Sequence, residues 1–512
     1  MSKTAVPAAS RPAPTEFGSV ARGGLLNVGG AIVAAVVNVL IVLVVARSFT
    51  PAVAGIFFSV TSVFLIIETV AKLGTSTGLV YFLSRHRALN RSEQSPAVLR
   101  VALVPVLSCA LVGSVTLLIL APWMAGFVVR GDPGDFVTLL QIAAIFIPVA
   151  ALSDSCLAAT RGFGQMAATV SVDRILRPTL QLLLIFVVAV LGSAPLLSAA
   201  WAGPYLPAAA LAVFALFRIF RRLARDPSPA VTDWVGFWRF TTPRAVASVA
   251  QLALQRLDII LVAALRGPAE AAIYTAATRF LVLGQLGSQA IALAVQPQLG
   301  VRLAQEDRAG ASRLYQTGTA WLILMTWPLY LLAVLFAPYL LALFGESYAE
   351  GAIVVVILCL TMLLATGCGM VDMVLSMAGR TSWNLANSSL ALGVNVALNL
   401  WLIPPLGITG AAIAWSVAIL VNNLLPLAQV GLILGLHPFG SATRTAALLS
   451  VLGFGLLPGL ALLLGAPAPG GVFVAALAGA TLFVWGCWRQ RTLLALDSLR
   501  ALRSQRTLKR TT

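Results

Sequence analysis

Charged residues are scarce in this chain: they make up 10% of its 512 positions, whereas hydrophobic residues make up 59%. Soluble domains carry roughly 25% charged residues, so the composition excludes a soluble globular protein and indicates a polytopic membrane protein. Acidic residues are fewest, 17 against 34 lysines and arginines, which gives a formal net charge of +17. The basic residues lie mostly in loops between apolar runs, where they orient helices and meet anionic headgroups. No nucleic-acid partner is therefore expected.

Cysteine is also sparse, and no motif of a catalytic or metal site is present. The cysteines all lie within apolar runs without metal or redox spacing, which is typical of small packing residues: Cys109, Cys156, Cys359, Cys368 and Cys487. The chain has no G-x-x-x-x-G-K-[ST] pattern for nucleotide phosphates. Its short loops exclude the large extracytoplasmic catalytic loop of a membrane glycosyltransferase or polymerase. We expect a protein that is not an enzyme, without catalytic residues, metal ion or cofactor.

Long apolar runs are abundant. A membrane-spanning helix needs about 20 apolar residues, and by that measure the sequence predicts an all-α protein with fourteen transmembrane helices. The predicted spans lie near 25–46, 53–75, 98–120, 136–157, 172–191, 197–217, 241–265, 271–298, 317–341, 350–376, 384–403, 409–435, 445–465 and 470–488.

The distribution of basic residues predicts the orientation of these spans. Arginines recur in every second loop, between Arg85 and Arg100, at Arg161, between Arg218 and Arg244, between Arg302 and Arg313, at Arg380 and at Arg444. The opposite loops hold only Arg47, Arg130 and Arg266. Because the alternation holds throughout, both termini are predicted to be cytoplasmic.

One passage of the chain occurs twice. Residues 255–302 match the residues 217 positions earlier without gaps; for example, Pro51 and Ile56 match Pro268 and Ile273. The polar residues Glu68 and Lys72 fall opposite Gln285 and Gln289. Six spans separate the copies, so the copies share one orientation and predict parallel repeats, a plan common among transporters.

The repeat predicts five parts of the chain. Residues 1–23 are expected to form a disordered cytoplasmic tail, 24–225 and 226–436 two six-helix lobes, 437–490 an additional two-helix hairpin, and 491–512 a basic cytoplasmic tail.

Ionisable residues inside apolar runs are the candidate substrate-binding residues, since each costs roughly 2.5–3.5 kcal/mol near the bilayer centre. Glu68 and Lys72 are spaced i,i+4 on the second span, which suits an ion pair on one helical face. Two interpretations stay open: a neutralised pair against a neighbouring helix, and a pair that lines a cavity. The glutamines opposite them, Gln285 and Gln289, favour the cavity.

The seventh and eighth spans carry three more charges. Arg256 and Asp258 lie two residues apart, so they point to different faces and need separate partners. Arg279 could form a salt bridge with Asp258 or contact substrate, and the sequence leaves both open.

Charges also lie near the inner ends of spans. Arg174 and Arg177 begin the fifth span, where snorkelling to headgroups and lining of an inward-facing mouth are both possible. Asp154 lies near the inner end of the fourth span, where a hydrogen-bonded packing role is favoured over titration or cation binding.

Three segments resemble the polysaccharide flippase family, the Wzx-like branch of the superfamily that also holds MATE exporters and lipid II flippases. They are ARSFTPAVAGIFFSVTSV, RLDIILVAALRGPAEAAIYTAATRF and LGITGAAIAWSVAI, and the resemblance covers roughly Gly24 to Leu436. It implies two six-helix lobes around a central cavity in a bacterial cytoplasmic membrane.

The resemblance also implies the function. It predicts alternating-access export of an undecaprenyl-diphosphate-linked oligosaccharide to the outer leaflet for surface polysaccharide synthesis, such as O-antigen, capsule or exopolysaccharide. The expected partners are this glycan, membrane lipids, a polysaccharide polymerase and a chain-length regulator. Basic cavity residues would face the diphosphate. The alternative is a cation-coupled MATE-type multidrug exporter.

The chain departs from two relatives in its first span. Lipid II flippases show an Arg-Asp pair there, whereas Val39 to Val45 is wholly apolar. MATE exporters show an acidic residue there for the coupling cation, and none lies between Leu25 and Ala46. Glu68 or Asp258 could take that role.

Overall fold

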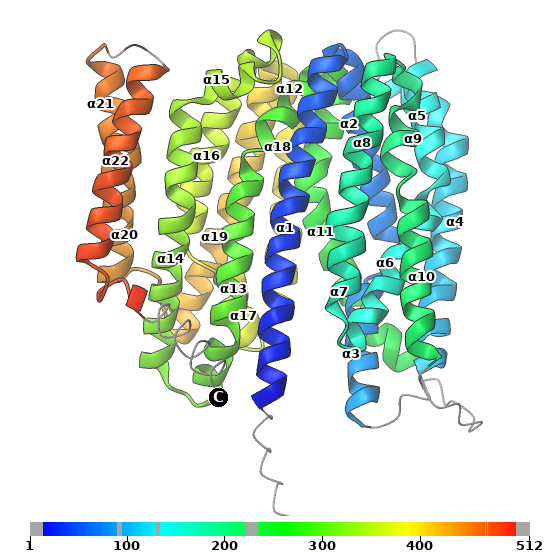
Figure 1. The fold of residues 1–512 in the computed structure, drawn as a ribbon, viewed down its shortest axis with the longest axis horizontal. Coiled ribbons are helices and arrows are strands. Elements are labelled where there is room, and N and C mark those ends of the chain that lie inside the picture. Colours follow the sequence, from blue (N-terminus) through cyan, green and yellow to red (C-terminus); the bar gives the residue numbers. More distant parts are fainter. Residues whose placement is uncertain are drawn as a thin grey trace, which may run out of the picture.

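The computed structural model describes residues 14–89, 95–128, 134–221, 234–465, 467 and 469–497. Within these ranges the chain is helical and contains no strand. Figure 1 shows the long helices running side by side between the two ends of one bundle, with α1 near its middle. We call the end where α1 leads into α2 the outer end and the opposite one the inner end, after the orientation that the charge pattern predicts.

The helix bounds are as follows. The first half holds α1 (Pro14–Ser48), α2 (Pro51–Ala71), α3 (Thr75–Ala88), α4 (Ser95–Val128), α5 (Gly134–Ile145), α6 (Ile147–Gly162), α7 (Met166–Ala168), the π-helical segment η2 (Thr169–Leu176), α8 (Arg177–Leu191), η3 (Ala194–Leu196), α9 (Leu197–Ala202) and α10 (Tyr205–Phe220). The second half holds α11 (Trp234–Arg266), α12 (Pro268–Thr278), α13 (Leu281–Ala304), α14 (Arg308–Leu335), α15 (Ala337–Ala342), η4 (Glu346–Gly351), α16 (Ala352–Gly367), α17 (Val371–Met377), α18 (Thr381–Leu406) and α19 (Ile408–Leu434). The chain continues with α20 (Ser441–Ser450), η5 (Val451–Leu456), α21 (Leu457–Leu463) and α22 (Gly470–Arg489).

The predicted class, an all-α membrane protein, is confirmed. Thirteen helical segments of the described residues are long and apolar enough to cross a membrane, each at a predicted span. The remaining predicted span, 271–298, is formed by α12 and α13, which meet at Arg279 and Phe280. The predicted tail 1–23 is helical from Pro14 onward. Residues 1–13 and 498–512 of the predicted tails, the predicted lobe boundary at 225–226 and Arg130 lie outside the described residues.

The largest hydrophobic cluster, at the outer end, joins the two halves. It contains residues of both, among them Val45 and Phe64 of the first and Ile273 of the second. At the inner end the cluster around Leu79 belongs to the first half except for Phe237 of α11 and Trp238 packed against it, and the cluster around Tyr315 belongs to the second half. The halves therefore share a large core at the outer end, whereas at the inner end the first turns of α11 join them.

The two copies of the repeated passage pack on each other at this joined end. Pro51 and Pro268 open α2 and α12, where proline's missing N–H costs no helical hydrogen bond. Gly55 of α2 lies against the backbone of Pro268, so closely that a Cβ on Gly55 would overlap the Pro268 carbonyl oxygen. Only glycine permits this approach of the two helices.

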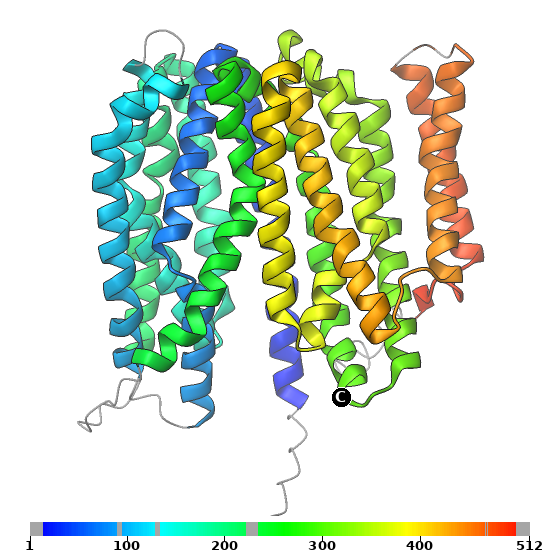
Figure 2. The ribbon, with the colours of Figure 1, turned by 180° about the vertical axis from the view of Figure 1, so that it is seen from behind.

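Helix α11 contributes to the cores of both halves. Its first turns place Phe237 in the inner cluster of the first half, whereas Val262 near its end lies in the shared cluster. Pro243, which lacks an N–H and permits a kink, lies between these parts. Gly74, at a φ of +70°, lets α11 approach, because a Cβ there would lie 2.6 Å from the Ala245 amide nitrogen. Figure 2 shows α11 slanting across the bundle.

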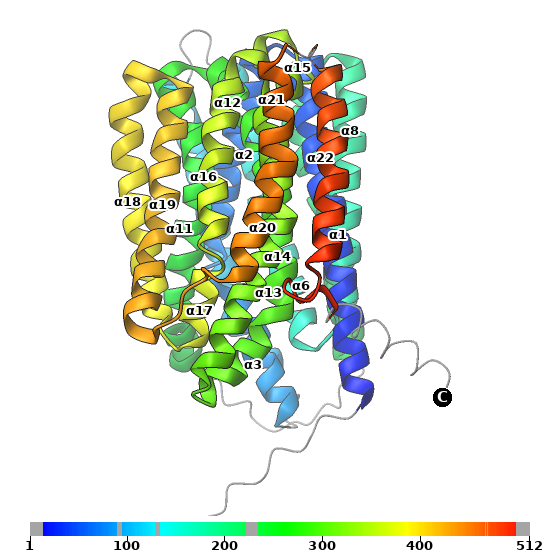
Figure 3. The ribbon, with the colours of Figure 1, turned by 90° about the vertical axis from the view of Figure 1, so that its left-hand side faces the viewer.

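The last helices, α20 to α22, form an addition at the side of the second half (Figures 1 and 3). They pack on α14, and Leu494, beyond α22, accepts a 2.8 Å hydrogen bond from the Trp321 indole of α14. Gly453 and Gly479 allow close contact between the two arms of this hairpin.

We predict that Gly55→Ala separates the repeated helices. The added methyl group must displace the Pro268 backbone, and such overpacking costs about 1–3 kcal/mol. Thermal unfolding of the purified protein in detergent would show a lower midpoint. The control is Gly126→Ala in α4, where an added Cβ meets nothing within 4 Å and helix propensity favours alanine. Equal midpoints for both variants would contradict the close approach.

Candidate substrate-binding site

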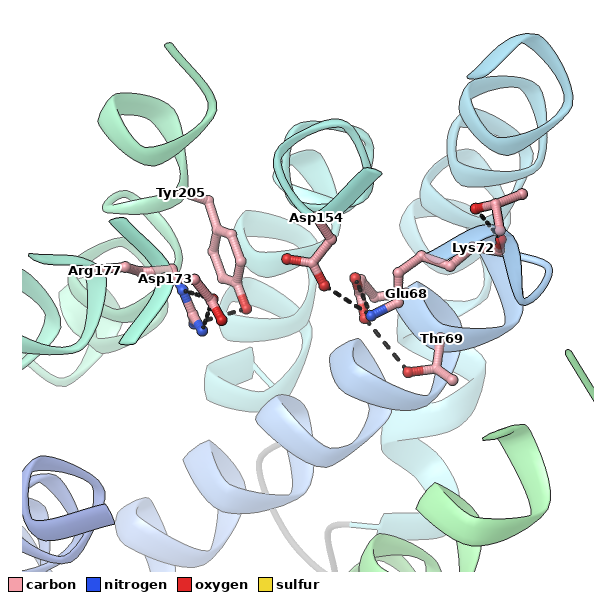
Figure 4. A network of polar contacts seen from close by, with 8 residues as sticks. Glu68, Thr69, Lys72, Asp154, Asp173, Arg177 and Tyr205 are labelled. Atoms are coloured by element: carbon pink, nitrogen blue, oxygen red, sulfur yellow. Dashed lines mark hydrogen bonds and ion pairs between the residues drawn. The ribbon is translucent and has the colours of Figure 1, made fainter. Parts of the chain in front are cut away.

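Lys72 lies between two carboxylates of the first half. Its Nζ is 2.9 Å from Oε1 of Glu68 and 2.8 Å from Oδ2 of Asp154. Glu68 is buried, with 3% of its surface exposed. The ion pair predicted from the i,i+4 spacing is therefore present. Figure 4 shows Asp154 reaching Lys72 from α6, on the opposite side from Glu68.

A second ion pair lies beside this group. Arg177, at the start of α8, is 2.7 Å from Oδ1 of Asp173 and donates a 3.0 Å hydrogen bond to the Tyr205 hydroxyl of α10. Its guanidinium lies 4.6 Å from the centre of the Tyr205 ring, within cation–π range. Asp173 belongs to η2, whose π-helical turn directly precedes α8. Figure 4 shows both ion pairs in one view.

Both cations of these groups already have carboxylate partners. Lys72 is paired with Glu68 and Asp154, and Arg177 with Asp173, so an arriving phosphate would have to displace a carboxylate from either cation. The role of Lys72 and Arg177 in binding substrate remains a prediction. Asp154, 82 residues from Lys72, could not be paired with it from any local spacing.

Arg279 occupies the break between α12 and α13. It is 9% exposed, and its guanidinium donates to the Thr275 carbonyl oxygen at 3.1 Å and to the Thr278 hydroxyl at 3.3 Å. No carboxylate forms an ion pair with it within the described ranges. The break in the helix turns this side chain toward the space between the halves.

The salt bridge considered between Arg279 and Asp258 is absent, which corrects that alternative. Asp258 is buried and accepts hydrogen bonds from the Tyr274 hydroxyl at 3.0 Å and from the Asn399 amide at 2.8 Å. These neutral donors on α12 and α18 bind the carboxylate. Asp258 therefore forms no ion pair with either arginine, although it lines the same cavity as both.

Arg256 and Arg279 line the same two cavities. The larger, about 230 Å³, also contacts Asn38 of α1, Gln285 of α13 and Trp415 of α19. The smaller, about 50 Å³, is bounded by Phe57 and other residues of the first half. Arg256 is half-buried, and among the described residues nothing forms a hydrogen bond or ion pair with it. Two arginines without an ion-pair partner in the described residues thus face a cavity between the halves, and Asp258, which accepts hydrogen bonds from Tyr274 and Asn399, lines the larger cavity with them.

The remaining predicted residues lie around this centre or apart from it. Gln285 is exposed and lines the larger cavity. Gln289 is exposed one turn further along α13. Arg174 is half-buried in η2 and lies against Gly30 of α1, where an added Cβ would come within 3.2 Å of its own Cβ. The structure therefore brings Arg256, Arg279 and Gln285 together.

A buried amide cluster surrounds Asp258. Asn395 and Asn399 lie one turn apart on α18 and are both 0% exposed. The Oδ1 atoms of both amides lack a hydrogen-bond donor in the described part of the chain. The sequence analysis did not single them out, although the sequence shows the two asparagines spaced i,i+4 within an apolar run. Such oxygens beside a carboxylate are the ligand type that hard monovalent and divalent cations prefer.

Comparison with solved structures shows which proteins share this fold. A lipid II flippase, MurJ, in an inward closed conformation aligns over 92% of this chain and 99% of its own, with a TM-score of 0.71 and 12% identity. An inward-facing multidrug resistance MATE family transporter of the MOP superfamily aligns over 80% and 98%, with a TM-score of 0.61 and 16% identity. A MOP superfamily transporter from Pyrococcus furiosus gives 0.56, with 17% identity over 81% and 95%. The chain shares its fold with these three proteins.

Comparison of the sequence with models of protein families shows the family of this chain. A model described as polysaccharide biosynthesis protein matches residues 20–301, more than half of the chain, and a model described as MatE matches residues 243–401. No curated protein sequence matches. The chain belongs to the polysaccharide biosynthesis protein family, which confirms the resemblance noted from its segments.

We predict that Lys72→Ala strongly destabilises the fold. The change leaves the buried Glu68 carboxylate and the half-buried Asp154 carboxylate without their cation, and removal of one partner of a buried pair costs about 3–5 kcal/mol. The measurement is the free energy of unfolding in detergent. The matched control is Arg302→Ala, which removes a 2.6 Å pair with Asp307 that is largely exposed; pairs of that kind contribute about 1 kcal/mol or less. A loss for Lys72→Ala no larger than for Arg302→Ala would show that the buried group does not depend on this cation.

Proposed function

We propose that the protein moves an undecaprenyl-diphosphate-linked oligosaccharide from the inner to the outer leaflet of the bacterial cytoplasmic membrane. The two halves would rock about their joined end, in alternating access. The observation that carries this proposal is the pair Arg256 and Arg279, which line one cavity between the halves and form no ion pair in the described residues, although Asp258 also lines that cavity.

Arginine suits the diphosphate chemically. The guanidinium is always charged and presents paired N–H donors that match two phosphate oxygens. A dianionic or trianionic diphosphate between two guanidinium groups would supply the missing counter-charge. Arg256 comes from α11 and Arg279 from the break between α12 and α13, so both would hold the ligand against the second half.

The size and position of the cavity support transport by a movement of the two halves. Its volume of about 230 Å³ lies below the roughly 300–1,000 Å³ of small-molecule pockets, so a diphosphate fits and a glycan requires the halves to separate. The separate cores at the inner end permit opening on that side. Since α1 forms one wall of both cavities, the lipid tail would leave toward the bilayer on the α1 side.

The other predicted residues have roles around this centre. Gln285 and Gln289 would offer amides to sugar hydroxyls, and Arg174 would meet the substrate at the inner mouth. Glu68–Lys72 and Asp173–Arg177 would keep the first half rigid as it rocks. Both termini would lie in the cytoplasm, as the charge pattern predicts, and the exported glycan would pass to a polysaccharide polymerase and a chain-length regulator.

A second candidate function is a cation-coupled multidrug exporter. It is favoured by Asp258, whose carboxylate and neighbouring amide oxygens could receive a coupling cation. Deletion of the gene separates the two candidates: loss of a surface polysaccharide with unchanged drug susceptibility supports the flippase, and drug sensitivity with normal polysaccharide supports the exporter.

We predict that Arg256→Gln and Arg279→Gln each reduce surface polysaccharide when they replace the wild-type protein. A lost charge-assisted hydrogen bond weakens binding by about 1.5–3 kcal/mol, or roughly tenfold to a hundredfold. The measurement is polysaccharide per cell at matched protein level in the membrane. Arg279→Lys should recover part of the loss, because it keeps the charge but not the paired donors.

The control for both variants is Arg266→Gln. Arg266 ends α11 at the outer end and is paired with Glu270 at 3.0 Å, away from the cavity. Polysaccharide should stay at the wild-type level in this variant. Wild-type levels in Arg256→Gln and Arg279→Gln as well would remove the arginine pair from the mechanism.

A further inference from the structure

A separate and larger groove lies within the first half. It has a volume of about 750 Å³ and is bounded on one side by η2 and α8 and on the other by α10. Its apolar walls include Ile175, Leu211 and Phe214, all exposed. Both walls belong to segments that cross the membrane. From Ser171 to Thr179 the η2–α8 wall extends roughly 12 Å at the rise of an α-helix, most of one leaflet's hydrocarbon depth.

The inner end of this groove is polar and positively charged. Arg218, in the last turn of α10, lines it and is exposed, with its guanidinium 5.8 Å from the centre of the Phe214 ring. Gln165, in the turn between α6 and α7, lies on the same rim. Within the described ranges Arg218 has no ion pair with a carboxylate. Apolar walls at membrane depth and a free guanidinium at their end match one amphiphile with an anionic headgroup.

We propose that an anionic phospholipid binds in this groove. Its phosphate would contact Arg218 and Gln165, and one acyl chain would lie between η2–α8 and α10. The proposal does not depend on which substrate the protein transports, because the groove shares no lining residue with the cavities at Arg256 and Arg279.

The lipid would also stabilise an element of the candidate site. The turns of η2 that line the groove with Ser171, Val172 and Ile175 carry Asp173 and Arg174 between these positions. A π-helical turn interrupts the hydrogen-bond pattern of an α-helix and is often found at functional sites. A chain bound along η2 would therefore hold the segment that positions the ion pair of Asp173 with Arg177.

The test is native mass spectrometry of the full-length protein, purified in detergent and mixed with phosphatidylglycerol or phosphatidylcholine. We expect wild-type protein to retain phosphatidylglycerol preferentially. Arg218→Ala should lower its retention about tenfold, the loss of one charge-assisted contact. Ala215→Leu, which fills the groove without touching the charge, should lower retention of both lipids.

The matched control is Arg380→Ala. Arg380 is also exposed at an inner helix end and lies over a neighbouring aromatic ring, 5.7 Å from that of Trp383, but it is outside the groove. Its loss should leave retention unchanged. The proposal is overturned if Arg218→Ala behaves like Arg380→Ala, if Ala215→Leu retains lipid normally, or if the wild-type protein binds both lipids equally.

Discussion

The constraint on which the structure depends is the burial of positive charge between its halves. A charged side chain at membrane depth costs roughly 2.5–3.5 kcal/mol on insertion scales, and the chain handles that cost in two ways. Lys72 and Arg177 are paired with carboxylates at 2.7–2.9 Å. Arg256 and Arg279 have no such partner in the described residues, although Asp258 lies two residues from Arg256. Neutral donors occupy Asp258, so the uncompensated charge stays where an anion can reach it.

The packing of the halves keeps that charge accessible. The repeated helices α2 and α12 meet at Gly55 and Pro268, and the large hydrophobic cluster that both halves share lies at this outer end. At the inner end the two clusters are separate, and the first turns of α11 place Phe237 in that of the first half. A joint at one end and separate cores at the other permit rocking without the exposure of a shared core. The arginines lie between these two regions, where rocking would change their access to each side.

Much of this architecture could be predicted from the sequence, because apolar runs and arginine-rich loops are local signals. The equivalence of helices that the internal repeat predicts stays a prediction. Glu68 and Lys72 could be paired because an i,i+4 spacing is local. Asp154, Tyr205 and Asn399 could not be assigned, since their contacts join helices far apart in the chain. The alternative that paired Arg279 with Asp258 was wrong for the same reason: Tyr274 and Asn399, as donors to Asp258, depend on tertiary packing. The helical start at Pro14 escaped prediction because Pro, Ala and Ser dominate that segment.

The most direct measurement of the central claim is the affinity of the purified protein for undecaprenyl diphosphate and for undecaprenol, which has the same tail without charge. If Arg256 and Arg279 receive the diphosphate, the wild-type protein binds the diphosphate at least about tenfold more tightly than the alcohol. A protein with both arginines changed to glutamine then binds the two lipids alike. Undiminished preference for the diphosphate in that doubly changed protein would contradict the account.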